Sequence, residues 1–85
     1  MATIRITQYL RPNKTPAIVY AEIPDELKGK ADLLEISCEW LPGGLAAIYA
    51  HVKGQSEEDE LSEIADNGPG PNSPEQALIR LINRF

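Results

Sequence analysis

The sequence predicts a single small α+β domain over residues 1–85: an antiparallel sheet of four to five strands with two helices packed on one face. Three observations predict it. The length of 85 residues suits one domain. Apolar and polar residues alternate in segments 3–10, 17–23 and 34–52, as in half-buried strands. A broad apolar stripe with helical spacing runs through residues 74–85. The expected order is strand–strand–helix–strand–strand–(strand)–helix.

The first two strands are predicted at residues 3–10 and 17–23. Alternation in the first strand places three apolar residues on one side: Ile4, Ile6 and Leu10. The second strand does the same with Val19, Ala21 and Ile23. Between them, residues 11–16 contain two prolines and an asparagine, which is typical of a loop. We therefore expect an antiparallel hairpin.

Residues 24–34 predict a short helix of two to three turns. Pro24, Asp25 and Glu26 suit a first helical turn, because proline needs no backbone donor there and acids favour the positive end of the helix dipole. Gly29 in the middle weakens the helix by about 1 kcal/mol relative to alanine.

Residues 34–52 predict a second hairpin whose register follows from its turn. Pro42, Gly43 and Gly44 are turn residues. If the turn has three residues, Leu41 opposes Leu45 and every pair on one face is apolar: Trp40–Ala46, Cys38–Ile48, Ile36–Ala50 and Leu34–Val52. A two-residue loop would move the whole set to the wrong face. The three-residue loop is preferred, and it sets Glu35 opposite His51.

Residues 55–68 fit two structures. A helix is indicated by Ser56 as N-cap, acids in the first turn and Gly68 as a stop signal. A short edge strand near residues 60–65 is indicated because the preceding strand needs a return partner. Charged residues on such a strand would blunt its edge.

The last helix has a clear start. Ser73 is the predicted N-cap, Pro74 the first helical residue, and Gln76 completes a capping box. We expect five residues to be nearly buried: Ile36, Trp40, Ile48, Leu78 and Leu81. The Pro- and Gly-rich connection 67–71 is interpreted as a stiff joint, with a binding loop as the alternative.

Several short motifs recur together over nearly the whole chain. "ITQYLRPN", "EIPDE", "EISCEWLPGG", "NGPGP" and a terminal "LI" resemble a group of short phage and prophage proteins of uncharacterised function. The resemblance favours the strand over the helix near residues 60–65. That family has Pro-Asp-Gly in its first hairpin loop, whereas this chain has Pro12-Asn13-Lys14. The resemblance implies no catalytic residue.

The charge is unevenly placed. Net charge is −5, yet residues 1–53 hold six basic and six acidic residues, and residues 54–79 hold seven acids and no lysine or arginine. Phosphate contacts need clustered cations, so direct nucleic-acid or membrane binding is not expected. The candidate partner-binding residues are Glu57, Glu58, Asp59, Glu60, Glu63 and Asp66.

The sequence offers little catalytic chemistry. Cys38 and His51 are the single cysteine and histidine, and the predicted register puts them on opposite faces, so no nucleophile–base dyad is expected. No zinc set, phosphate loop or EF-hand pattern is present. We therefore expect no enzyme, no cofactor and no metal. One cysteine and no signal peptide indicate a reducing cytoplasmic setting, and the resemblance to phage proteins implies the cytoplasm of a bacterial host.

These observations favour a non-catalytic, phage-type acidic protein that binds a macromolecular protein partner. One form is an inhibitor whose residues 57–66 imitate nucleic-acid charge, so that it occupies the basic nucleic-acid-binding surface of a host defence or regulatory protein. The alternative is an oligomer-forming structural or accessory protein of a phage assembly. That alternative would use exposed apolar residues: Tyr9, Ile18, Tyr20 or Ile79.

Overall fold

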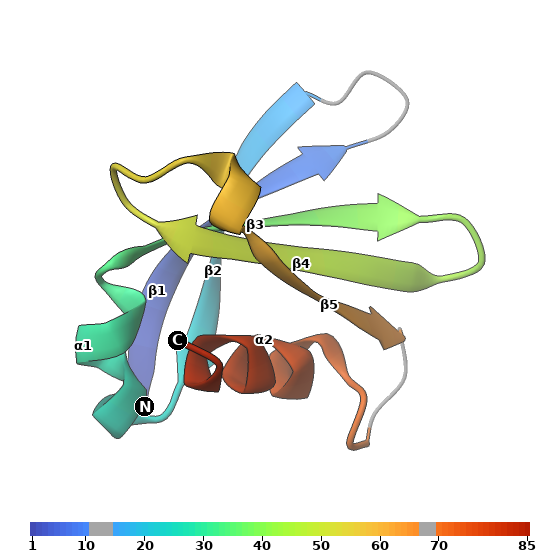
Figure 1. Ribbon diagram of the computed structural model, residues 1–85. Coiled ribbons are helices and arrows are strands. Elements are labelled where there is room, and N and C mark those ends of the chain that lie inside the picture. The colour runs from blue at the N-terminus through green and yellow to red at the C-terminus, as the bar shows by residue number, and fades with distance from the viewer. Residues whose placement is uncertain (11–14, 67–69) are drawn as a thin grey trace.

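A computed structural model describes residues 1–10, 15–66 and 70–85 (Figure 1). It confirms the α+β class: five strands form one sheet in the order β2-β1-β3-β4-β5. The elements are β1 (Ala2–Leu10), β2 (Thr15–Ile23), η1 (Asp25–Leu27), α1 (Lys28–Ala31), β3 (Leu34–Leu41), β4 (Leu45–Val52), η2 (Glu57–Asp59), β5 (Leu61–Asp66) and α2 (Pro74–Asn83). The predicted loop residues 12–14 lie outside the described residues.

The sheet is mixed rather than purely antiparallel as predicted. β1 pairs with β2 in antiparallel fashion, but β1 and β3 are parallel, with Thr7 opposite Ser37. The cause lies in the connection 24–33. Strand β2 ends beside the start of β1, and the helical turns of η1 and α1 advance only about 1.5–2 Å per residue. The chain therefore begins β3 at that same end, and β3 runs in the direction of β1.

The β3–β4 hairpin has the predicted three-residue register. Leu41 faces Leu45, Trp40 faces Ala46 and Glu35 faces His51. Gly43 and Gly44 adopt φ of 84° and 78° in the turn. This left-handed region is costly for residues with a Cβ, so the two glycines make the short connection accessible.

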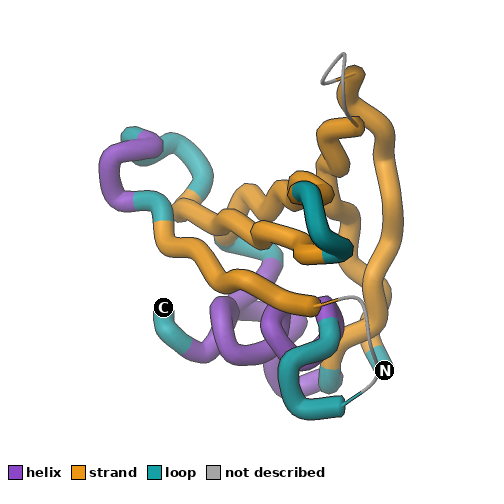
Figure 2. The backbone as a smooth tube through the Cα atoms, turned by 90° about the vertical axis from the view of Figure 1, so that its right-hand side faces the viewer, coloured by secondary structure: helices purple, strands orange, loops and turns teal. Residues whose placement is uncertain are grey.

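Helix α2 packs across one face of the sheet, and within the described residues the opposite face carries no α-helix (Figures 1 and 2). Its buried residues are Ala77, Leu78, Leu81 and Ile82. Ser73 caps the helix as predicted, because its Oγ accepts a hydrogen bond of 3.3 Å from the Gln76 backbone N–H. The prediction of two helices on one face differs in one respect: η1 and α1 form only a short helical segment, whose Ala31 joins the core beside β1 and β3.

The core lies between α2 and the sheet. Ile36, Ile48, Leu78 and Leu81 are buried as predicted. Trp40 is only partly buried, which corrects the prediction. It sits near the end of β3, where the cover is provided by Pro74 and Leu78 from the first turns of α2, and these residues leave a small apolar cavity beside the indole.

Residues 55–68 contain a short helical turn and a strand, so each of the two structures predicted for this segment is present in part. Ser56 Oγ accepts a hydrogen bond from the Glu58 backbone N–H at 3.2 Å, but it starts only the single turn η2. The chain then forms β5, which confirms the preference for a strand. Residues 67–69 lie outside the described residues. The described part of the following turn is fastened to β5, since Asp66 N–H donates to the Asn72 carbonyl at 3.0 Å, and this supports the interpretation as a joint.

Candidate functional site

The six candidate acids do not form one continuous surface, because β5 and its neighbours send them in different directions. Glu58 and Asp59 are exposed in the turn η2. The backbone of Glu57 belongs to the same turn, and its side chain lies outside the described part of the structure. Asp66 stands at the other end of β5, where its backbone is tied to Asn72.

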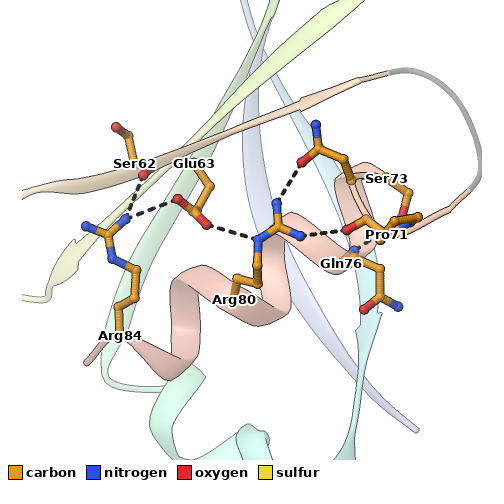
Figure 3. A network of polar contacts seen from close by, with 8 residues as sticks. Ser62, Glu63, Pro71, Ser73, Gln76, Arg80 and Arg84 are labelled. Carbon is orange, nitrogen blue, oxygen red and sulfur yellow. Dashed lines mark hydrogen bonds and ion pairs between the residues drawn. The ribbon is translucent and has the colours of Figure 1, made fainter.

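Glu63 is held by two arginines on the helix side of the sheet (Figure 3). Arg80 Nε lies 3.1 Å from Glu63 Oε1, and Arg84 Nη1 lies 3.2 Å from Glu63 Oε2. Its side chain is only 23% exposed. These contacts neutralise the carboxylate locally, so Glu63 fastens α2 to β5 rather than facing a partner.

The same two arginines also bind backbone and amide oxygens. Arg80 donates to the Pro71 carbonyl at 2.7 Å and to Asn72 Oδ1 at 2.8 Å (Figure 3). Arg84 donates to the Ser62 carbonyl at 2.9 Å. Sequence reasoning missed this network because both arginines come after the cation-free segment 54–79. The available signal was the polar face of the last helix, whose cations needed a partner on the sheet.

Glu60 lies on the opposite, uncovered face and contacts His51. Glu60 Oε2 is 3.3 Å from His51 Nδ1, and Glu35 Oε2 is 3.3 Å from His51 Nε2. The predicted Glu35–His51 pair is thus confirmed, and Glu60 is an additional partner. The His51 side chain is 12% exposed. Its Nδ1 is buried without a well-aligned hydrogen bond, so Glu60 lies close to the imidazole without good hydrogen-bond geometry.

The surroundings of His51 form a cavity of about 420 Å³ on the uncovered face. Its lining carries both signs of charge: Arg5 and Lys53 as cations, Glu35 and Glu60 as anions. Within the described residues, no group of three or more histidine, cysteine, aspartate or glutamate side chains could hold a metal ion. A mixed polar surface of this kind suits charged groups of a partner, and it does not concentrate positive charge as phosphate binding requires.

Cys38 and His51 lie on opposite faces of the sheet. Cys38 lines an apolar cavity of about 110 Å³ on the helix side, together with Trp40 and Leu78. Burial raises the pKa of the Cys38 thiol, because desolvation disfavours the thiolate. The thiolate is the nucleophilic form, so Cys38 is a poor nucleophile where it stands, and the imidazole cannot reach it.

The fold and these contacts define a small α+β protein whose sheet is covered on one face. The sequence matches no protein family, and comparisons with curated proteins and with solved structures find no significant similarity. In the part of the chain that the structure describes, no helix is long and apolar enough to span a membrane.

Proposed function

We propose that the protein acts without catalysis, by binding a macromolecular partner through an acidic corner formed by Glu35, Glu58, Asp59 and Glu60. The observation that carries the proposal is the convergence of Glu35 and Glu60 on His51, directly beside the exposed turn η2. Glu35 comes from β3, outside the segment singled out from the sequence. It joins the corner because His51 draws together two acids that are distant in the chain.

The corner is partly preorganised. Glu35 and His51 stand on paired positions of two neighbouring strands, and Glu60 directly precedes β5. Strand-borne groups lose little freedom on binding, so a partner would not have to order them first. Concentrated negative charge also steers a basic surface toward the protein and raises the association rate.

A partner with a basic, nucleic-acid-binding surface fits this arrangement best. We infer the role of a charge-mimicking inhibitor of a host defence or regulatory protein in a bacterial cytoplasm. Two features support a non-catalytic role: Cys38 and His51 are on opposite faces, and the Cys38 pKa is raised. Glu63 no longer belongs to the proposed surface, since Arg80 and Arg84 occupy its carboxylate.

The test is to neutralise the corner without changing the size of its side chains. The variant carries Glu35→Gln, Glu58→Gln, Asp59→Asn and Glu60→Gln. The partner is recovered from bacterial extract by affinity capture, and its association rate is measured against ionic strength. We expect slower association at low salt and a flatter salt dependence, with the fold unchanged by circular dichroism because exposed charges contribute little to stability.

A matched control removes the same charge elsewhere. Glu22→Gln, Glu26→Gln, Asp32→Asn and Glu75→Gln change four exposed acids, three glutamates and one aspartate, away from the corner. This control should associate nearly as fast as the parent. Equal association rates for the corner variant and its control would contradict the proposed site.

A second candidate function is that of an oligomer-forming structural or accessory protein of a phage assembly. One observation favours it: Tyr9, Ile18 and Tyr20 are 38%, 46% and 68% exposed on the uncovered face. Ile79, the fourth residue named from the sequence for this role, is only partly exposed. Two of these three residues, Ile18 and Tyr20, stand on the edge strand β2.

A further inference from the structure

The sheet has two edge strands, β2 and β5, and they differ in protection. At β5, the Ser62 carbonyl accepts from Arg84 and the Asp66 N–H donates to Asn72, so both ends of the outer edge have partners within the chain. Glu60 directly precedes this strand, and Glu63 and Asp66 lie within it. Natural proteins use such charges and covers to prevent pairing with another chain.

In the described part of the chain, strand β2 is less protected than β5. It is nine residues long, and in the described part of the chain it pairs only with β1. Its single charged residue is Glu22, at the penultimate position. Ile18 and Tyr20 expose large apolar side chains in the middle of the strand. A long, apolar and unpaired edge is a template for another strand.

We propose that β2 pairs with β2 of a second copy of this chain, antiparallel around a two-fold axis at Val19, to form one continuous sheet. A two-fold interface uses the same patch on both copies, so the strand must be complementary to itself. This inference rests on the second candidate function and is independent of the acidic corner.

Self-complementarity selects the register. With Val19 opposite Val19 of the partner, Ile18 faces Tyr20 of the partner, and this pair occurs twice. Aromatic and β-branched residues in direct opposition are favourable cross-strand pairs. On the helix side, Ala17 faces the partner's Ala21, and both residues are small and apolar. Glu22 faces the partner's Pro16, so no like charges oppose each other.

Other registers lose this fit. Moving the axis to Tyr20 sets Glu22 opposite the partner's Ile18, and moving it to Ile18 sets Tyr20 opposite the partner's Pro16. An odd shift would set residues of the uncovered face against residues of the core face. Pro16 has no backbone N–H to donate to a partner strand, and as the second residue of β2 it lies near the end of the paired segment, where the loss of one hydrogen bond matters least.

The length of the strand is adequate for a specific contact. Nine extended residues span about 30 Å at roughly 3.3 Å per residue. The molecule itself measures 32 × 30 × 21 Å, so the edge runs across nearly its whole width. Pairing would also cover Val19 and Ala21, which the short helix α2 leaves only partly buried.

The first test is the mass in solution by sedimentation or light scattering against concentration. The mass should rise from 9.4 kDa toward twice that value. Two charged variants follow. Ile18→Lys with Tyr20→Lys places lysine against lysine, and Ile18→Glu with Tyr20→Glu places glutamate against glutamate. Each variant alone should stay monomeric, and an equimolar mixture should regain the dimer through two Lys–Glu pairs.

The matched control is Ile64→Lys on the other edge strand. Ile64 is 49% exposed, close to the 46% of Ile18, so the two substitutions expose similar chemistry on opposite edges. Ile64→Lys should dimerise like the parent. Loss of the dimer in Ile64→Lys but not in the β2 variants would overturn the proposal. A parent mass that stays at 9.4 kDa up to a protein concentration of about 1 mM would also overturn it, because any association would then be very weak.

A cross-link tests the register without relying on charge. In a Cys38→Ser background, Val19→Cys places two thiols at the two-fold axis, where the Cα separation of an antiparallel pair, about 4.5–5.5 Å, matches disulfide geometry. Oxidation should give a covalent dimer faster for Val19→Cys than for Ile18→Cys or Tyr20→Cys. Faster cross-linking at Ile18 or Tyr20 would overturn the proposed axis.

Discussion

The two edges of the sheet show how one helix can protect a molecule unevenly. Helix α2 makes more of its contacts with β4 and β5 than with β2, and its Arg84 reaches the Ser62 carbonyl on the edge of β5 (Figure 3). No element does the same for β2 in the described part of the chain. The difference follows from chain length: one ten-residue helix cannot cover a five-stranded sheet from edge to edge. Protection of one edge therefore leaves the other edge accessible to another chain.

The largest effect should come from the core that supports the protected edge. Leu81 is fully buried, so Leu81→Ala should cost about 2–5 kcal/mol of unfolding free energy by transfer and cavity terms. Val19 on β2 is only partly buried, and Val19→Ala should cost about 1 kcal/mol. Chemical denaturation measures both values. Equal losses would contradict the complete burial of Leu81 and the partial burial of Val19.

A smaller effect should follow from opening the β5 edge. Arg80→Ala removes the contacts with Glu63, Pro71 and Asn72, and about half of the arginine is solvent-exposed, so we expect a loss of about 1 kcal/mol. The backbone amides of residues 62–66 should exchange with deuterium faster, while those of β2 should not change. Arg5→Ala, on the uncovered face, is the control for loss of a positive charge. If deuterium exchange of the β5 amides did not change, the contacts of Arg80 would not stabilise this edge.

The smallest effect concerns Cys38, in the part of the core where the cover by α2 is thin. Its pKa is raised by burial, so the folded protein holds the thiol proton at a pH where the unfolded chain has released it. The folded state then binds more protons, and stability falls as pH rises above the ordinary thiol pKa of about 8.5. Cys38→Ala should remove this part of the slope. Denaturation midpoints between neutral and alkaline pH, for parent and variant, measure it; identical slopes would contradict burial of the thiol.

Most of the local structure could be predicted from the sequence because it depends on neighbouring residues. Alternation and the glycine turn determine the β3–β4 register, and Ser73 and Pro74 determine the start of α2. Pairing between distant segments was less accessible. Nothing in β1 or β3 alone indicates that these strands are parallel neighbours, since that depends on where the connection 24–33 returns the chain.

The candidate site was predictable only in part for the same reason. Charge counting along the chain located the acids, but it could not tell which of them would meet a cation in space. Glu63 meets Arg80 and Arg84, and Glu60 meets His51. The burial of Trp40 was overestimated because alternation identifies the face of a strand but not how far a helix extends over it.

The short parallel contact between β1 and β3 has a mechanical consequence. The β1–β2 hairpin is paired over nine positions and β3–β4 over eight, yet β1 and β3 meet in register over three, from Thr7 to Tyr9. The sheet therefore contains two hairpins, β1–β2 and β3–β4, that are joined by a short stretch of parallel pairing. Helix α2 bridges the two hairpins through its contacts with β2, β4 and β5. A load applied through the outer edge of β2 therefore reaches the other hairpin through this short β1–β3 contact and through the helices that bridge the two hairpins.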